Sequence, residues 1–181
     1  MAIPGSNHPK QQLRKEMRAL LKSSSPDSDP AISKVRDWLK SHPGLQTIAI
    51  YSALPGEIDL TSLVDLLPQI RWVFPRVQES ELVLHQVRNR QQDLKIGAFG
   101  IREPLKMLPT VTSFDVDAFF CPGLAFDEYG GRLGRGRGFY DRMLESARPG
   151  ALKIGVCRKE QIVPETHGEP HDIFMDEVIS A

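Results

Sequence analysis

A glycine- and arginine-rich stretch in the last third of the chain constrains its fold most. Residues 130–142 read Gly-Gly-Arg-Leu-Gly-Arg-Gly-Arg-Gly-Phe-Tyr-Asp-Arg and hold five of the fourteen glycines and four arginines. The apolar run 116–123 before it predicts a buried strand, and the helical spacing of 140–147 after it predicts a helix. The loop therefore joins a strand end to a helix start, where unpartnered N–H groups and the helix dipole favour an anion. Because glycine permits close backbone approach and arginine donates in pairs, the pattern predicts a polyphosphate-binding loop.

Other interpretations of this loop compete with the first. Gly-Arg repeats also occur in disordered RNA-binding tracts, but those lie in low-complexity sequence, whereas apolar strand and helix patterns flank this one. A purely structural turn needs one or two glycines, whereas this stretch has five. A Walker A loop would end in Gly-Lys-Ser/Thr, and a dinucleotide fingerprint needs an early βαβ unit with an acidic residue about 20 positions further on. Spacing alone therefore indicates an anion site at a helix start, and the RNA-binding module stays as an alternative.

The composition indicates a globular protein with no global attraction to nucleic acid or membranes. The 181 residues carry 23 basic and 23 acidic side chains, so any electrostatic function must come from local clusters. We expect one domain over residues 1–181, with 1–7 as a loose tail. Cys121 and Cys157 lie in apolar runs, which favours buried free thiols in a reducing compartment. With no apolar run near 18 residues and no secretory signal pattern, we expect a cytoplasmic protein, monomeric by default, with small-molecule partners rather than nucleic acid or membrane.

Helical and strand patterns alternate along the chain. This alternation, with apolar runs typical of parallel strands, predicts an α/β fold with a mainly parallel sheet and helices on both faces. Residues 94–104 are expected to form a Gly- and Pro-punctuated connection, and 106–112 a loop. Helices are predicted at 8–23, at 29–39 with Asp29 as N-cap, and at 60–67 with Asp59 as cap; strands are predicted at 47–51, 71–76, 81–87, 116–121, 152–157 and 175–179.

Several charged residues outside the glycine loop are candidate ligands. Lys10 and Arg14 are four apart and share one helix side, where they form either a solvated basic face or a pair of phosphate ligands. Glu57 follows a predicted strand, where open α/β sheets place ligand contacts, although a solvated loop carboxylate remains the simpler interpretation. Asp141 is either a Mg²⁺ ligand beside the phosphates or a helix-dipole partner worth roughly 0.3–1 kcal/mol. Asp172 is a second loop carboxylate that would complete the metal shell.

Several motifs together resemble the 5-formyltetrahydrofolate cyclo-ligase family. The specific signature comprises Pro122-Gly-Leu-Ala-Phe-Asp127 followed by residues 131–142. In order and spacing the resemblance spans nearly the whole chain. Its further segments are Lys10 with Leu13-Arg14, Glu57-Ile-Asp59, Phe99-Gly-Ile-Arg-Glu-Pro104, Val163-Pro164, His171-Asp172 and Asp176-Glu-Val-Ile179.

The resemblance implies an enzyme of folate one-carbon metabolism with a sugar-phosphate-isomerase/CoA-transferase-like α/β sandwich. Such an enzyme uses ATP and Mg²⁺ to convert 5-formyltetrahydrofolate to 5,10-methenyltetrahydrofolate, with release of ADP and phosphate. The alternatives are a relative that keeps the nucleotide site but takes another substrate, and the RNA-binding module.

The resemblance also implies roles for individual residues. Arg135, Arg137 and Tyr140 would be catalytic, and Asp141 and Asp172 would hold Mg²⁺. The folate site would comprise Leu54, Glu57, Phe99 and Tyr140. The ATP site would comprise Lys10, Arg14, Arg132, Leu133, Gly134, Arg135, Gly136, Arg137, Gly138, Phe139 and Tyr140.

Overall fold

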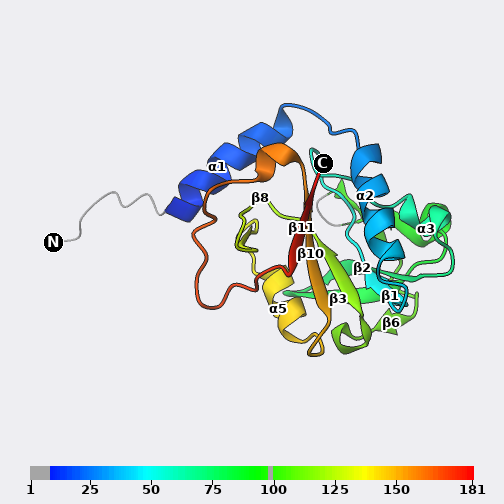
Figure 1. Cartoon of the computed structure of the whole chain (residues 1–181). Coiled ribbons are helices and arrows are strands. Elements are labelled where there is room, and N and C mark those ends of the chain that lie inside the picture. Colours follow the sequence, from blue (N-terminus) through cyan, green and yellow to red (C-terminus); the bar gives the residue numbers. More distant parts are fainter. Residues whose placement is uncertain (1–8, 98–99) are drawn as a thin grey trace.

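A computed structural model describes residues 9–97 and 100–181 of the chain, and its centre is a seven-stranded sheet (Figure 1). The strands are β1 (Thr47–Ala49), β2 (Arg71–Gln78), β3 (Glu81–Gln86), β6 (Thr110–Val111), β7 (Ala118–Cys121), β10 (Leu152–Cys157) and β11 (Glu177–Ser180). They lie in the order β11-β10-β7-β1-β2-β3-β6. The five strands from β11 to β2 are parallel to their neighbours, and β3 and β6 add an antiparallel edge. The predicted mainly parallel α/β arrangement is confirmed.

Helices cover both faces of this sheet. They are α1 (Pro9–Lys22), α2 (Asp29–Lys40), α3 (Leu63–Leu66), α4 (Arg90–Asp93) and α5 (Phe139–Glu145), with short 3₁₀ turns η2 (Ser113–Asp115) and η3 (Lys159–Gln161). Ala31 and Val35 of α2 share a core cluster with Ile48 and Phe120, whereas Met143 of α5 packs in a second cluster. Since successive strand side chains point to opposite faces, β1 and β7 contribute to both clusters. In Figure 1, α2 and α3 lie on one side of the sheet and α5 on the other.

Helix α1 rests on a small ribbon instead of the main sheet. The ribbon pairs β8 (Ala125–Phe126) with β9 (Arg132–Leu133), and Met17 and Leu21 of α1 pack against Leu124 and Leu133. This contact carries the N-terminal helix to the glycine-rich loop that follows β9. A second hairpin joins β4 (Leu94–Ile96) to β5 (Arg102–Pro104).

The topology creates a crevice beside the central strand. Strand β1 lies between β2 and β7, so the chain leaves β1 toward one side of the sheet and later returns on the other. At such a reversal the loops after the two strands diverge, and ligands bind outside the carboxyl ends. The segment 50–57 follows β1, and the segment 122–138 follows β7.

Local details differ from the predictions at several points. Helix α2 has Ser28 at its N-cap and no side-chain cap bond, so Asp29 is not the cap. Asp59 accepts a hydrogen bond from the Thr61 N–H in a turn, and α3 begins only at Leu63. The predicted connection 94–104 contains the β4–β5 hairpin, and the predicted loop 106–112 contains β6. These strands have two or three residues, too few to show an alternating pattern.

The described part of the chain also bears on two composition-based expectations. Cys121 and Cys157 are buried free thiols, and burial raises the pKa of each to about 12. None of the described helices combines the length and the apolar character that a membrane crossing would need.

Candidate active site

A cavity of about 1000 Å³ lies at the carboxyl ends of β1 and β7. Its wall includes four segments far apart in sequence: α1, the segment after β1, the loop from β9 to α5, and residues 169–173. Pro75 and Val77 of β2 and Leu82 of β3 add apolar side chains to it. All but two of the predicted site residues line it. Leu133 is fully buried under α1, and Phe99 lies outside the described residues. The predicted residues in the wall are Lys10, Arg14, Leu54, Glu57, Arg132, Gly134, Arg135, Gly136, Arg137, Gly138, Phe139, Tyr140, Asp141 and Asp172.

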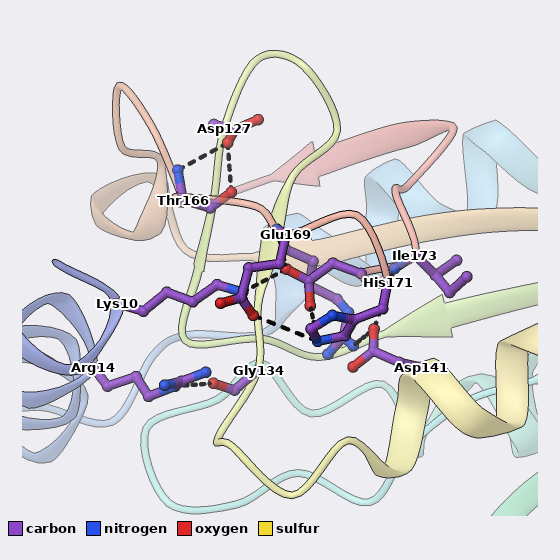
Figure 2. Close-up of polar contacts among 11 residues, drawn as sticks. Lys10, Arg14, Asp127, Gly134, Asp141, Thr166, Glu169, His171 and Ile173 are labelled. Carbon is purple, nitrogen blue, oxygen red and sulfur yellow. Dashed lines mark hydrogen bonds and ion pairs between the residues drawn. The ribbon is translucent and has the colours of Figure 1, made fainter. Parts of the chain in front are cut away.

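Lys10 and Arg14, the two predicted ligands on α1, line this cavity, as does Arg18. Lys10 is only 5% exposed, and its Nζ lies 3.0 Å from Glu169 Oε2 and 2.5 Å from Asp172 Oδ2. Arg14 Nε donates to the Gly134 carbonyl at 3.1 Å, and Figure 2 shows both side chains reaching from α1 toward these partners. Burial alone would lower the pKa of Lys10, but the two carboxylates raise it, so Lys10 is charged at neutral pH. The geometry therefore argues against a solvated basic face, because both side chains bond to groups of the cavity wall.

The glycine loop adopts conformations that its sequence requires. Gly136 and Gly138 have φ of +98° and +64°, in the left-handed region where a side chain would be strained. Arg18 Nη2 donates to the Arg135 carbonyl at 3.0 Å, which is a second link from α1 to this loop. Helix α5 then begins at Phe139, directly after the left-handed Gly138. The loop is thus held from one side by α1 while its arginine side chains line the cavity.

Glu57 is buried and bonded to the glycine loop. Its Oε1 accepts from Arg135 Nη2 at 2.7 Å and Nε at 3.3 Å, and its Oε2 accepts from the Leu54 N–H at 3.0 Å. The turn that presents it depends on Gly56, which has φ +87° and whose added Cβ would lie 2.0 Å from the Leu21 carbonyl oxygen. Sequence analysis did not single out Gly56, although Pro-Gly is an ordinary turn signal. The simple solvated carboxylate is therefore not what the structure shows.

Arg132 and Asp141 form an ion pair behind the loop. Arg132 Nη2 lies 3.0 Å from Asp141 Oδ1, and its guanidinium carbon lies 5.4 Å from the Tyr140 ring centroid. Asp141 Oδ1 also accepts the Ile173 N–H at 3.3 Å, as seen in Figure 2. Burial raises the pKa of Tyr140 well above its usual value, so its hydroxyl remains protonated. Arg132 therefore helps to place Asp141 and Tyr140 at the cavity wall.

Carboxylates suitable for a divalent cation gather at one end of the cavity. The ligand atoms of Glu169, His171 and Asp172 lie within 4.8 Å of one another, and no Asp141 atom belongs to that group. Asp141 is nevertheless linked to this segment, since it accepts from Ile173, the residue after Asp172. Oxygen donors of this kind suit Mg²⁺. His171 entered the sequence-based prediction only as part of the His171-Asp172 segment of the family resemblance. Glu169 was missed, because nothing in the spacing shows that this loop meets Lys10.

A buried carboxylate outside the cavity supports the start of the glycine stretch. Asp127 accepts hydrogen bonds from Thr166 Oγ1 at 2.6 Å and from the Thr166 N–H at 2.9 Å (Figure 2). It also accepts one from the Gly131 N–H at 2.8 Å. Burial would raise the pKa of Asp127, but these bonds lower it below the usual value. The role is structural: the side chain ties the β8–β9 turn to the segment after η3.

The fold and cavity define a class of protein before any comparison. An α/β protein whose cavity at a strand-order reversal combines several cations, paired carboxylates and apolar side chains such as Val77 and Leu82 is suited to bind an anionic, ring-containing small molecule. The chain belongs to the 5-formyltetrahydrofolate cyclo-ligase family, which it matches over residues 6–181.

Individual relatives agree with this assignment. The 5-formyltetrahydrofolate cyclo-ligase of Mycolicibacterium smegmatis is 34% identical over 157 residues, which cover 81% of this chain and 79% of the relative. The enzyme of the same name from Escherichia coli K12 is 29% identical over 140 residues, which cover 74% of this chain and 77% of the relative.

Solved structures show the same fold. The Aquifex aeolicus 5,10-methenyltetrahydrofolate synthetase matches with a TM-score of 0.80 at 34% identity, over 94% of this chain and 89% of that one. The Mycoplasma pneumoniae synthetase matches with a TM-score of 0.76 over 94% and 98%, and at 23% identity it supports the fold alone.

Proposed function

We propose that this protein converts 5-formyltetrahydrofolate to 5,10-methenyltetrahydrofolate with ATP, releasing ADP and phosphate. Family membership supports the reaction. The observation that carries the proposal to this chain is the Glu57–Arg135 contact. It joins the carboxylate expected to bind folate to the loop expected to bind ATP, within a single cavity.

The chemistry requires positioning and charge stabilisation rather than a protein nucleophile. The formyl group on N5 is an amide whose oxygen is a poor leaving group. Transfer of the γ-phosphoryl group of ATP to that oxygen, with release of ADP, makes it a good leaving group. N10 then attacks the formyl carbon and closes the ring, and loss of the N10 proton to solvent and of phosphate gives the methenyl product. The protein must align two substrates and stabilise the transferring phosphoryl group. Arg135 and Arg137 are the proposed donors to that group, and Tyr140 is proposed to orient the reacting atoms from the wall.

The other charged residues have proposed binding roles. Lys10 and Arg14 would bind the ATP phosphates, because both already reach from α1 to the cavity. Glu57 would accept hydrogen bonds from N–H groups of the pterin ring. Asp141 and Asp172 would hold Mg²⁺, which neutralises phosphate charge when bound. Metal binding by Asp172 requires the Lys10 ammonium to leave Asp172 and to pair with a phosphate oxygen instead. Lys10 would therefore remain paired with an anion.

A single assay tests the reaction. Purified protein is incubated with 5-formyltetrahydrofolate, ATP and Mg²⁺, and the methenyl product is followed by its absorbance while ADP is measured separately. We expect product only when ATP is present, at one ADP per product. Absence of turnover at high enzyme concentration would contradict the proposal. ATP binding without turnover would favour a relative with another substrate, and salt-sensitive RNA binding without ATP would favour the RNA-binding module.

We further propose that the enzyme is a cytoplasmic monomer. The buried free thiols of Cys121 and Cys157 support a reducing compartment. Light scattering of the purified chain tests the oligomeric state directly.

A further inference from the structure

Buried polar atoms without partners are concentrated around the cavity. Within residues 9–97 and 100–181, five buried side-chain polar atoms lack a hydrogen-bond partner. Three of them, Tyr51 Oη, Ser52 Oγ and Arg132 Nε, belong to residues of the cavity wall. Such atoms are costly in a folded protein and call for an explanation. A ligand that supplies the missing partner is the explanation that their common location favours.

Tyr51 is the most informative of the three. It follows β1 directly, and it is only 2% exposed with its ring in the main core cluster. The Ile50 N–H bonds to the Val73 carbonyl and keeps this segment in strand geometry, so the tyrosine has a fixed direction. Its hydroxyl is therefore held at the carboxyl end of the central strand, where this fold places its ligands. No described residue bonds to that hydroxyl.

The surroundings of Tyr51 determine what its hydroxyl can do. Burial, with the nearby Glu57 carboxylate and Tyr140 adding to it, raises the pKa of Tyr51 well above its usual value. The hydroxyl therefore keeps its proton and can donate a hydrogen bond. Glu57, six residues further on, is a carboxylate that only accepts. Together they present one donor and one acceptor in the same wall.

This pair complements one edge of a pterin ring, which carries a carbonyl oxygen beside N–H groups. Glu57 suits the N–H groups, but it would repel the carbonyl oxygen, which needs a neutral donor. We propose that Tyr51 is a substrate-binding residue whose hydroxyl donates to the ring carbonyl of the folate while Glu57 accepts from the adjacent N–H groups. The inference rests on the proposed function and adds to it a residue that selects the ring.

Tyr51→Phe tests this contact because it removes only the hydroxyl. We expect the Kd and KM for 5-formyltetrahydrofolate to rise by about 3- to 10-fold, the range for one hydrogen bond. The KM for ATP should stay within about 2-fold. The melting temperature should be unchanged or higher, since the variant removes an unpartnered buried group from the free protein. Tyr129→Phe is the matched control, because Tyr129 is 80% exposed and lies outside this cavity.

Two further measurements locate the contact. Binding of pterin-6-carboxylate, which has the ring without the glutamate tail, should show the same fold loss in Tyr51→Phe, as followed by pterin fluorescence. A double-mutant cycle with Glu57→Gln should be non-additive, because both side chains bind one ring edge.

The outcomes separate this inference from the proposed function. If the wild type turns over substrate and Tyr51→Phe leaves the folate and pterin Kd unchanged, the inference is overturned while the function stands. A lower melting temperature with equal losses for folate and ATP would also overturn it, since that pattern marks a purely structural role. Absence of turnover by the wild type, with pterin binding still weakened in Tyr51→Phe, would overturn the function and support the ring contact.

Discussion

Replacing Glu57 by glutamine should strengthen nucleotide binding while it weakens folate binding. In the free protein, Arg135 donates twice to one oxygen of Glu57, with the shorter contact at 2.7 Å. Arg135 cannot hold Glu57 in this way and bind a phosphate with the same N–H groups. Nucleotide must therefore compete with Glu57 for the guanidinium. Glu57→Gln keeps the shape of the side chain and removes the charge that competes.

The structure bounds the size of this effect. The Glu57 side chain is 6% exposed, but that of Arg135 is 37% exposed, so solvent screens the pair. A net contribution of about 1 kcal/mol is appropriate for such a partly exposed, charge-assisted contact. Release of Arg135 should then tighten nucleotide binding by up to about 5-fold. Loss of the carboxylate should weaken folate binding by about 10-fold or more, because hydrogen bonds to a charged group contribute about 1.5–3 kcal/mol.

Isothermal titration calorimetry with a non-hydrolysable ATP analogue and Mg²⁺ measures the effect with and without 5-formyltetrahydrofolate. In the wild type, folate should tighten nucleotide binding by occupying Glu57, and linkage requires nucleotide to tighten folate equally. Glu57→Gln should abolish this coupling. Glu160→Gln serves as a control, since Glu160 pairs with Arg158 away from the cavity. Unchanged or weaker nucleotide binding in a folded Glu57→Gln protein would refute the competition.

Three other variants test the metal site, the acid stability and the packing, with Gly150→Ala as the control for the third. Asp141→Asn should raise the Mg²⁺ concentration for half-maximal activity by about 10-fold, because the proposed metal site would lose one charged oxygen ligand. Burial would raise the pKa of Asp127, yet four hydrogen bonds lower it below the usual 3.8. Its stabilisation is therefore present above the unfolded pKa and lost as pH falls through the lower folded pKa, so the wild type should lose stability below about pH 3.8 more steeply than Asp127→Asn. Gly130→Ala should cost about 3 kcal/mol in urea unfolding, because its φ is +84° and the new Cβ would lie 2.3 Å from the Met175 carbonyl oxygen. Gly150→Ala should cost only about 1 kcal/mol, because its φ is +83° but nothing lies within 4 Å.

Each of these expectations has a clear contrary result. An unchanged Mg²⁺ titration in Asp141→Asn would leave that residue its structural contacts with Arg132 and the Ile173 N–H and its place in the first turn of α5. The free energy of unfolding of the wild type and of Asp127→Asn is measured with urea at several pH values. If it falls equally steeply for both at acidic pH, the four hydrogen bonds do not favour the ionised form of Asp127. Equal losses for the two glycine variants would mean that backbone conformation, not the clash with Met175, sets the cost.

Long periodic segments were predictable because their signal is local. Leu13, Met17, Leu20 and Leu21 recur at helical spacing, and the structure has α1 over Pro9–Lys22 with Met17 and Leu21 buried. The strand formers in 152–157 likewise form β10 with the predicted bounds. Short elements were missed for the same reason. The two-residue strands β8 and β9 gain their pairing from tertiary packing under α1, so Arg132 lies in a strand and not in the loop.

In the candidate site, too, the features that depend on neighbouring residues were predictable and those that depend on distant contacts were not. The glycine loop was evident in the sequence, since its left-handed backbone at Gly136 and Gly138 favours glycine; the anion site that its clustered arginines predict stays a prediction. Lys10 was ambiguous, since its spacing on the helix is the same whether it faces solvent or a carboxylate. Only the docking of α1 on the β8–β9 ribbon turns it toward Glu169 and Asp172.

By itself, the sequence determined the mainly parallel α/β class and the family, and it predicted a polyphosphate-type loop, because these depend on periodicity and on motifs of neighbouring residues. The tertiary structure alone decided that Glu57 meets Arg135 across 78 positions, that Arg132 bonds to Asp141, and that Tyr51 keeps an unpartnered hydroxyl in the same wall. The physical reason is that such contacts depend on strand order and helix docking. Both are set by burial summed over the whole chain, and no local pattern records them.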